Sequence, residues 1–455
     1  MPDVVMLMPL PNPEPTNISF TAIVAICNNK GERKKNSSKD SYQSELVGFE
    51  LFDNRFEYRC IFLHRNHYNL LMSEIRKYFL ATIVAVASVL VVWSPFALKI
   101  EKFWGINFAD KSMLTIAQNY DAMNFLVVAR SWYDPTIIEQ NYGALVGERG
   151  TRYFAAHYPL YASVIAFFDI FLSGPYAIYA SILFSNILFA TSLIIFFKRF
   201  APDSRMIIPL SILALFLPPR ILPLRAIGSN EFLCLAFVLL SIVSHDQKKQ
   251  GWSAVLGALA VLTRSPAILL FGAYVIEIVW KSGGRLKETF KNLTPYLLMP
   301  LTLLGLWGYY GMVYGDILAY FKVGGNLNLY IPPFMVFGSE LPWVSGFWRE
   351  DIMYLYIFIM MGVGLLWERS RRELNLRLIA IFSSIYAFSL FFVAHRDVSR
   401  YSILIAPLLV LGYGPYIIKT RFYWLLYILL IPLVLYSWNF ILGNIQPIAD
   451  WTPFL

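Results

Sequence analysis

Residues 78–98 read YFLATIVAVASVLVVWSPFAL, a predominantly apolar run that directly follows the basic pair Arg76 and Lys77. A run of about 20 apolar residues is long enough to cross the hydrocarbon core of a bilayer as a helix. We therefore expect a transmembrane helix over 78–98. Because basic residues favour the cytoplasmic side, the pair places the start of this helix inside and the following loop, 99–157, outside.

Apolar segments recur along the rest of the chain, which is 57% hydrophobic and only 15% charged. Soluble proteins carry about 25% charged residues, so this composition indicates an integral membrane protein. The predicted fold is an all-α polytopic bundle of about 11 transmembrane helices with a large first extracytoplasmic loop. We expect the further apolar segments at 158–173, 175–197, 206–219, 221–243, 252–263, 266–280, 296–314, 351–367, 377–394, 401–418 and 422–440.

The basic loops define an orientation for this bundle. Loops 281–291 and 368–377 are rich in Lys and Arg and are expected inside. The second large loop, 315–350, and the turn 395–400 then face outside, together with the C-terminus. Lys198, Arg199 and Arg205 also favour the inside. Two full crossings between 158 and 197 would instead return the chain to the outside. One segment in that stretch is therefore expected to be re-entrant or to lie in the membrane interface.

The first 77 residues differ in composition from the remainder. They are polar and show no sustained periodicity, so we interpret 1–77 as an N-terminal extension that is disordered or reflects a misassigned start, with Met72 as the true one. Residues 78–455 form the transmembrane domain. The net charge of +9 lies mostly in short loops, which favours contact with membrane lipid and argues against a nucleic-acid partner.

Polar clusters occupy most of the loops that are expected outside. Asp121 follows the first helix in the stretch 120–133, where a lone carboxylate at a membrane face is costly unless it has a use. The alternative is an ordinary acidic residue of an amphipathic surface helix. A carboxylate can accept a proton from a hydroxyl nucleophile, and arginines can hold a phosphate through paired donors. Together they suggest a lipid-phosphate substrate, although each arginine taken singly could anchor a lipid headgroup.

Arg264 interrupts an apolar run as Leu262-Thr263-Arg264-Ser265-Pro266. Because Pro266 would break a continuous helix, we expect a helix pair with Arg264 at its apex. Asp110 has no context beyond that of a solvated residue. The sequence contains no Walker loop and no HExxH motif, which argues against nucleotide hydrolysis and zinc proteolysis.

These motifs, in this order, resemble those of the GT-C fold glycosyltransferases, in particular the second mannosyltransferase of GPI-anchor synthesis and its prokaryotic relatives. That group has a first-loop pattern of roughly W-D-x-x-x-Y-x-x-I-A-x-x-G-Y, whose positions here are Tyr120, Asp121, Phe125, Ala129, Trp132 and Tyr133. The aspartate and the last tyrosine match, whereas the leading Trp, the central Tyr and the Gly are replaced. Further similar motifs follow in register at 158–161 (YPLY), 229–231 (SNE), 262–266 (LTRSP), 315–321 (GDILAYF) and 399–401 (SRY).

The resemblance implies an inverting transfer of a hexose, by family a mannose, from a polyprenyl-phosphate sugar to a hydroxyl of a lipid, glycan or protein acceptor. Asp121 would be the catalytic base. No cofactor is expected, because lipid-phosphate donors often react without a metal and the family is not strictly metal-dependent. The donor phosphate would be held by Arg264, Arg400 and His395. The remaining substrate contacts are expected from Tyr133, His157, Tyr158, Glu231 and Asp316.

The same resemblance places the active site on the outer face of a prokaryotic plasma membrane. One alternative is a multi-pass lipid or solute transporter or flippase, which would predict internal repeats and charges near the middle of the bilayer. The acids instead cluster near the expected outer face, and no repeat is evident in the sequence. A further alternative is a non-catalytic assembly subunit, in which Asp121 would be dispensable.

Overall fold

The computed structural model describes residue 72 and residues 75–323, 329–420, 423–448 and 451–455. The prediction for the N-terminal extension falls almost entirely outside these residues. At its end, however, Ile75–Lys77 already belong to the first helix, Ile75–Ala97, so this helix begins three residues before the predicted position 78. Apart from a small antiparallel hairpin of β1 (Lys102–Phe103) and β2 (Ile106–Asn107), the regular structure described is helical.

Six helices among the described residues are long and apolar enough to cross a membrane. By their length and composition, they indicate that the described part of the chain is an all-α membrane protein. They are Ile75–Ala97, α7 (Pro175–Phe200), η4 with α12 (Ser265–Ser282), α13 to α14 (Leu286–Tyr314), α16 (Gly346–Ser370), and α18 to α19 (Val398–Lys419). Five shorter apolar helices accompany them, namely α6 (Pro159–Asp169), η3 with α8 (Ser204–Phe216), α11 (Gln250–Thr263), η7 with α17 (Leu374–Leu390) and the stretch Leu426–Leu442.

Within these composite helices, short 3-10 turns (η) mark the bends. Their bounds are η3 (Ser204–Met206), α8 (Ile207–Phe216), η4 (Ser265–Ile268), α12 (Leu269–Ser282), α13 (Leu286–Leu293), η5 (Thr294–Leu297), α14 (Leu298–Tyr314), η7 (Leu374–Leu376), α17 (Arg377–Leu390), α18 (Val398–Tyr401), η8 (Ser402–Ile405), α19 (Ala406–Lys419), η9 (Tyr423–Leu429) and α20 (Leu430–Leu442).

Three sequence-based boundaries differ from the structure. The segment expected over 158–173 contains only α6, whose 11 residues are too short to cross a bilayer unaided. The segment expected over 221–243 is broken into α9 (Ile221–Arg225) and α10 (Glu231–Asp246), because residues 226–230, which include Gly228 and the polar pair Ser229 and Asn230, intervene. The second large loop ends at 345, since α16 already begins at Gly346.

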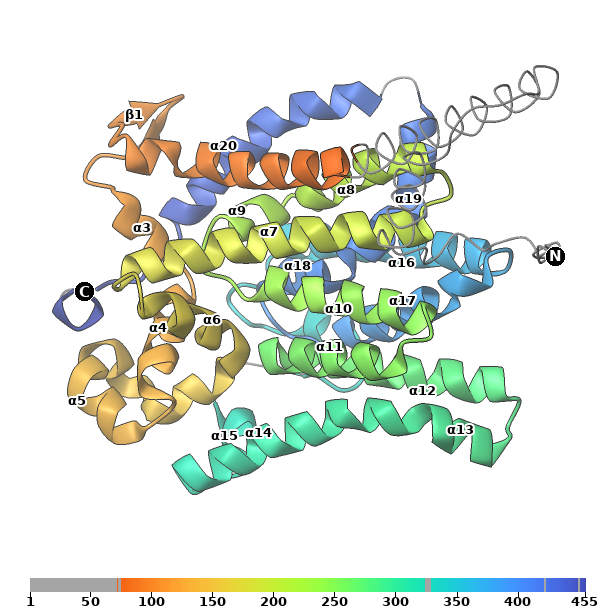
Figure 1. Ribbon diagram of the computed structural model, residues 1–455. Helices are drawn as coiled ribbons and strands as arrows, with labels where there is room; N and C mark the ends of the chain where they lie inside the picture. The colour runs from red at the N-terminus through yellow and green to blue at the C-terminus, as the bar shows by residue number, and fades with distance from the viewer. Residues whose placement is uncertain (1–71, 73–74, 324–328, 421–422, 449–450) are drawn as a thin grey trace, which may run out of the picture. The chain divides into compact units, whose positions relative to one another are not determined.

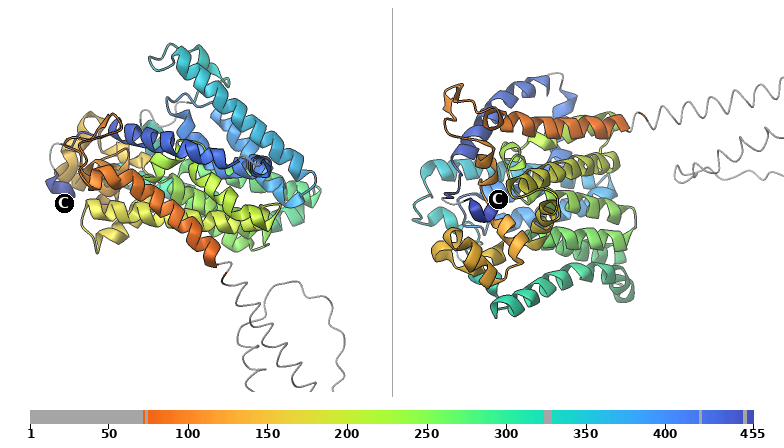
Figure 2. Two further views of the ribbon diagram at one scale, coloured as in Figure 1. Left: turned by 90° about the horizontal axis from the view of Figure 1, so that it is seen from above. Right: turned by 60° about the vertical axis from the view of Figure 1, so that its left-hand side comes forward.

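The first loop is built from short helices that gather at one end of the bundle, where β1 and the C-terminal segment also lie (Figures 1 and 2). Arg130 on α4 forms a bidentate ion pair with Asp169 at the end of α6, with N···O distances of 2.7 and 2.9 Å. Asn119 donates from Nδ2 to the Ile441 carbonyl at 2.5 Å, which ties the loop to α20. The elements are α3 (Met113–Ala117), α4 (Ala122–Ser131), α5 (Pro135–Val146), η1 (Gly147–Arg149) and η2 (Thr151–Ala156), and the other loops add α15 (Ala319–Lys322), η6 (Met335–Gly338) and η10 (Thr452–Phe454).

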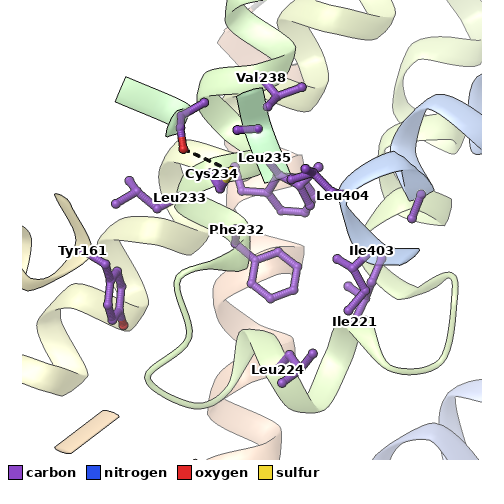
Figure 3. Close-up of a cluster of buried hydrophobic side chains, with 14 of the residues drawn as sticks. Tyr161, Ile221, Leu224, Phe232, Leu233, Cys234, Leu235, Val238, Ile403 and Leu404 are labelled. Atoms are coloured by element: carbon purple, nitrogen blue, oxygen red, sulfur yellow. Dashed lines mark hydrogen bonds between the residues drawn. The ribbon is translucent and has the colours of Figure 1, made fainter. Parts of the chain in front are cut away.

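The first turns of α10 are anchored in the apolar core (Figure 3). Phe232 and Leu235 are buried together with Ile221 of α9 and Ile403 of η8. The Cys234 thiol lies 3.6 Å from the Ala260 carbonyl of α11. Each large apolar side chain buried in this way contributes about 1.5–3 kcal/mol to the stability of the fold. Glu231, the first residue of α10, therefore has a fixed position relative to α9, α11 and η8.

Candidate active site

A cavity of about 930 Å³ lies among the first loop, the second large loop and the breaks in the helical bundle. Asp121, Arg264 and Arg400, although distant in sequence, all line it. Of the described residues, seven cationic side chains line this cavity, namely Arg149, Arg152, Arg220, Arg264, Lys322, Arg396 and Arg400. Such a concentration of positive charge favours an anionic ligand.

Asp121 lies at the N-terminal boundary of α4, and its carboxylate faces the cavity. The side chain makes no capping hydrogen bond to the helix. The preceding residue, Tyr120, has a left-handed φ of 59°, which is unusual for a bulky residue. It is held there by its backbone N–H, which donates to the Asn444 carbonyl at 3.2 Å, and by its hydroxyl, which donates to Asp397. The backbone turn before α4 is therefore fixed by contacts to the C-terminal part of the chain.

Arg400 donates from Nη2 to the Asp121 carboxylate at 2.8 Å, and His157 Nε2 lies 3.8 Å from the other carboxylate oxygen. Burial acts to raise the pKa of the Asp121 carboxyl, but the guanidinium of Arg400 and the imidazole of His157 outweigh this effect and hold the pKa well below its usual range. Asp121 is therefore a carboxylate at neutral pH. If a bound anion shares Arg400, the attraction on Asp121 weakens and the carboxylate becomes a stronger base.

Glu231 forms ion pairs with two of the arginines that line the cavity. Its carboxylate pairs with both Arg264 and Arg400, and Ser229 donates to its second oxygen at 2.5 Å. Glu231 is only 2% exposed and does not line the cavity. The geometry does not support a direct substrate contact from Glu231, because its oxygens are occupied by protein partners. Glu231 positions Arg264 and Arg400 instead, and such a buried acid is tolerable because it is fully paired.

The local backbone explains how the two arginines reach the cavity. Arg264 has extended backbone angles between the end of α11 and η4, so the predicted helix pair with Arg264 at its apex is confirmed. Arg400 lies in the short helix α18, directly after the break that contains His395. The His395 Nδ1 atom accepts a hydrogen bond from the Asp397 N–H at 2.9 Å.

His395 lines the cavity, and burial lowers the pKa of its imidazole, with Arg400 and Arg396 acting in the same direction and Asp397 opposing them. The ring is therefore neutral at neutral pH. Since Nδ1 accepts from the backbone, Nε2 carries the proton and can donate to a ligand oxygen. This arrangement is compatible with the predicted role of His395 at a phosphate.

His157 and Tyr158 also line the cavity, as expected of ligand-binding residues. In the described part of the chain, neither His157 Nδ1 nor the Tyr158 hydroxyl has a hydrogen-bond partner, although both atoms are buried. Buried polar atoms usually have partners, so these two groups beside the cavity retain unused hydrogen-bonding capacity.

Two other predicted contacts lie outside the cavity wall. Tyr133 is 0% exposed, and its hydroxyl donates to the His157 carbonyl at 2.7 Å, so it supports His157 rather than touching substrate. Asp316 accepts from Lys322 Nζ at 2.7 Å and lies 3.7 Å from Arg152. Asp316 therefore holds two cations at the rim, and its prediction as a direct substrate contact is not supported by the geometry.

Arg220 and Asp397 form a second charged pair in the cavity, and sequence reasoning did not identify either as a site residue. Asp397 pairs with Arg220 and accepts from the Tyr120 hydroxyl. Arg220 had a detectable signal, because it follows Pro218 and Pro219 within an apolar stretch, as Arg264 precedes Pro266. Within the described ranges, no group of three or more His, Cys, Asp or Glu side chains is arranged to hold a metal ion.

Comparison of the chain with models of protein families, with curated proteins and with solved structures finds no match.

Proposed function

We propose that this chain is a membrane glycosyltransferase that transfers a hexose from a polyprenyl-phosphate sugar to a hydroxyl group of an acceptor. The observation that carries the proposal is the carboxylate of Asp121, which lies 2.8 Å from Arg400 in a cavity rich in arginine. A base beside a phosphate-binding cation is the pair of groups that such a transfer needs. By resemblance the sugar is a mannose and the acceptor a lipid, glycan or protein.

Charge supports an anionic donor. Of the described side chains, seven cations line the cavity, while four carboxylates pair with cations there, at Asp121, Glu231, Asp316 and Asp397. An excess of positive charge remains after this pairing. Arginine guanidinium groups hold phosphate oxygens through paired donors, so Arg264 and Arg400 suit the phosphate of the donor.

The proposed reaction is a single displacement with inversion at the sugar. The acceptor hydroxyl gives its proton to an oxygen of Asp121, and the hydroxyl oxygen forms a bond to the anomeric carbon. The bond between this carbon and the phosphate oxygen breaks, and the lipid phosphate leaves with the electron pair. Arg264, Arg400 and the Nε2–H of His395 stabilise the charge that develops on the leaving phosphate. General-base catalysis of this kind contributes about 10²–10⁴-fold.

The arrangement of helices supports a GT-C-like topology of about 11 crossings. If α6 does not cross, a first helix that runs outward places the end of α7 inside, where Lys198 and Arg199 satisfy the positive-inside rule. The turn from α12 to α13 and the end of α16 are then also inside. The cavity and the C-terminus face outside, as they would in a prokaryotic plasma membrane.

The purified chain in lipid nanodiscs, supplied with labelled polyprenyl-phosphate mannose and a panel of hydroxyl acceptors, tests the proposal. A transferase forms a labelled glycosidic product whose anomeric configuration is opposite to that of the donor. A flippase instead moves the labelled lipid across a proteoliposome membrane and forms no product. Movement without product would overturn the proposal in favour of transport.

A further inference from the structure

A second, apolar groove of about 250 Å³ lies between α8 and the final helical stretch, η9 and α20. Leu213 and Phe216 line it from α8, and Leu430 and Leu433 line it from α20. All the elements that form it are apolar helices of the membrane-embedded part of the chain. The side chains that line the groove are apolar apart from the two tyrosine hydroxyls, so an apolar chain would fit it.

The groove and the charged cavity meet at Arg220. Pro219 lines the groove, whereas the next residue, Arg220, lines the cavity. Arg220 Nη1 donates to the Tyr436 hydroxyl at 3.0 Å, and Tyr436 also lines the groove. The other terminal nitrogen of Arg220 pairs with Asp397, which faces the cavity. A molecule with an apolar tail and a charged head could thus occupy both spaces at once.

Arg220 retains an unused donor at this junction. Its Nε atom is buried and, among the residues that the structure describes, has no hydrogen-bond acceptor. Its guanidinium carbon lies 4.4 Å from the centre of the Phe440 ring, and the side chain is 20% exposed. A buried guanidinium N–H without a partner is unfavourable, and a phosphate oxygen would satisfy it.

We infer that the groove between α8 and α20 binds the hydrocarbon chain of a single-chain lipid phosphate, and that Arg220 contacts its phosphate where the groove joins the cavity. This inference rests on the proposed function and identifies the path by which the donor reaches Asp121. The small volume of the groove suits one chain rather than the two of a common phospholipid. Arg220 then joins Arg264 and Arg400 in holding the phosphate.

Binding to the purified full chain in nanodiscs tests this inference, with two probes, a long polyprenyl phosphate and isopentenyl phosphate. Leu430 is six residues before Tyr436 on α20, about 9 Å along the helix, so only the long chain reaches it. Leu430→Trp fills the groove and should weaken binding of polyprenyl phosphate roughly tenfold, with isopentenyl phosphate unaffected. The matched control is Ile431→Trp, since Ile431 lies on the same helix but is 48% exposed and does not line the groove.

Arg220→Lys keeps the charge but removes the Nε donor and should weaken binding of both probes by a similar factor. If the wild-type chain prefers polyprenyl phosphate but Leu430→Trp binds it equally well, the groove assignment is wrong while the proposed function stands. If Arg220→Lys binds both probes as wild type does, the phosphate contact is wrong. If the wild-type chain binds no polyprenyl phosphate, the proposed donor itself is wrong. Equal competition by dioleoyl phosphatidate would contradict the single-chain occupant.

Discussion

At the scale of single residues, the geometry of the site depends on which carboxylates each arginine contacts. Arg400 contacts both Asp121 and Glu231, and its guanidinium lies 4.3 Å over the Tyr120 ring. Glu231 is almost fully buried, whereas a quarter of the Asp121 side chain is exposed. Asp121, the acid that we propose as the base, is thus the accessible one, whereas Glu231, which pairs with two arginines, is almost fully buried.

Arg400→Lys should raise the KM for the lipid donor roughly tenfold and change the acceptor KM little. A lysine ammonium cannot reproduce the two directed contacts from Nε and Nη2, although the charge remains. Steady-state kinetics with each substrate varied in turn measure the effect. A matched rise in both KM values would argue against a role at the phosphate.

The pH dependence of stability reports on Asp121. Because the pKa of its carboxyl is lower in the folded chain than in the unfolded chain, the carboxylate stabilises the fold above the ordinary aspartate value, and this stabilisation is lost as pH falls through the depressed pKa. The difference in thermal stability between wild type and Asp121→Asn should therefore not shrink between neutral pH and about pH 5. Asp110→Asn, at an exposed position, is the control and should show no difference. A stability difference that already shrinks above about pH 5 would contradict the ion pair.

Sequence reasoning identified some of these residues and missed others for clear reasons. Arg264 was predicted to be a site residue because a single charge two residues before a proline, within an apolar run, has few structural explanations. The contact between Asp121 and Arg400 joins residues 279 positions apart, and periodicity carries no information about which helices become neighbours. Tyr133 was expected at the substrate because it matches a motif, but a motif position does not reveal which way a side chain points.

At the scale of elements, the site is made by interruptions of apolar helices. The chain breaks between α9 and α10, at Arg264 between α11 and η4, and before α18. Non-helical backbone in a membrane protein is tolerated where it lines a cavity rather than lipid, and residues next to all three breaks line this one. The composition predicted the helices well, but the break at 226–230 was only partly predicted, because the apolar residues on both sides favour one long segment.

Gly228 allows the break before α10 to approach the start of α4. A side-chain Cβ at position 228 would overlap the Ala122 Cβ and lie 3.0 Å from the Ala122 Cα, next to Asp121. Gly228→Ala should lower the free energy of unfolding by about 1–3 kcal/mol and reduce transfer, because α4 must shift. Thermal unfolding and the transfer assay measure both effects. Gly272→Ala, where a Cβ meets no atom within 4 Å, is the control, and equal behaviour of the two variants would contradict the close approach.

At the scale of the whole membrane-embedded unit, charge is divided between its two ends. The first-loop helices α3 to α5 lie at one end, and the turns from α10 to α11 and from α12 to α13 lie at the other (Figure 1). First-loop residues such as Asp121 and Arg149 line the cavity. Lys248, Lys281 and Arg285 occur at or near those turns. Under the positive-inside rule these residues favour a cytoplasmic position for that end, and we propose that the cavity faces the other side, where a lipid-linked sugar would be used.

Cysteine labelling in intact cells tests this orientation. In a chain whose Cys27 and Cys60 are replaced by serine, the remaining Cys234 is buried and should not react. Leu318→Cys, at a 48% exposed position near the cavity, should react with a membrane-impermeant maleimide. Leu286→Cys, at a 71% exposed position at the start of α13, should react only after the cells are permeabilised. The reverse pattern would place the cavity in the cytosol.

The most direct test of the account is the rate of a single turnover with bound polyprenyl-phosphate sugar, measured for Asp121→Asn and for Asp397→Asn. Both carboxylates line the cavity, but Asp397 also holds Arg220 and the Tyr120 hydroxyl, whereas Asp121 keeps its accessible oxygens next to Arg400. If Asp121 is the base, Asp121→Asn should slow the chemical step about 10²–10⁴-fold while donor binding persists, and Asp397→Asn should slow it far less. Transfer at the wild-type rate by Asp121→Asn would contradict the central claim.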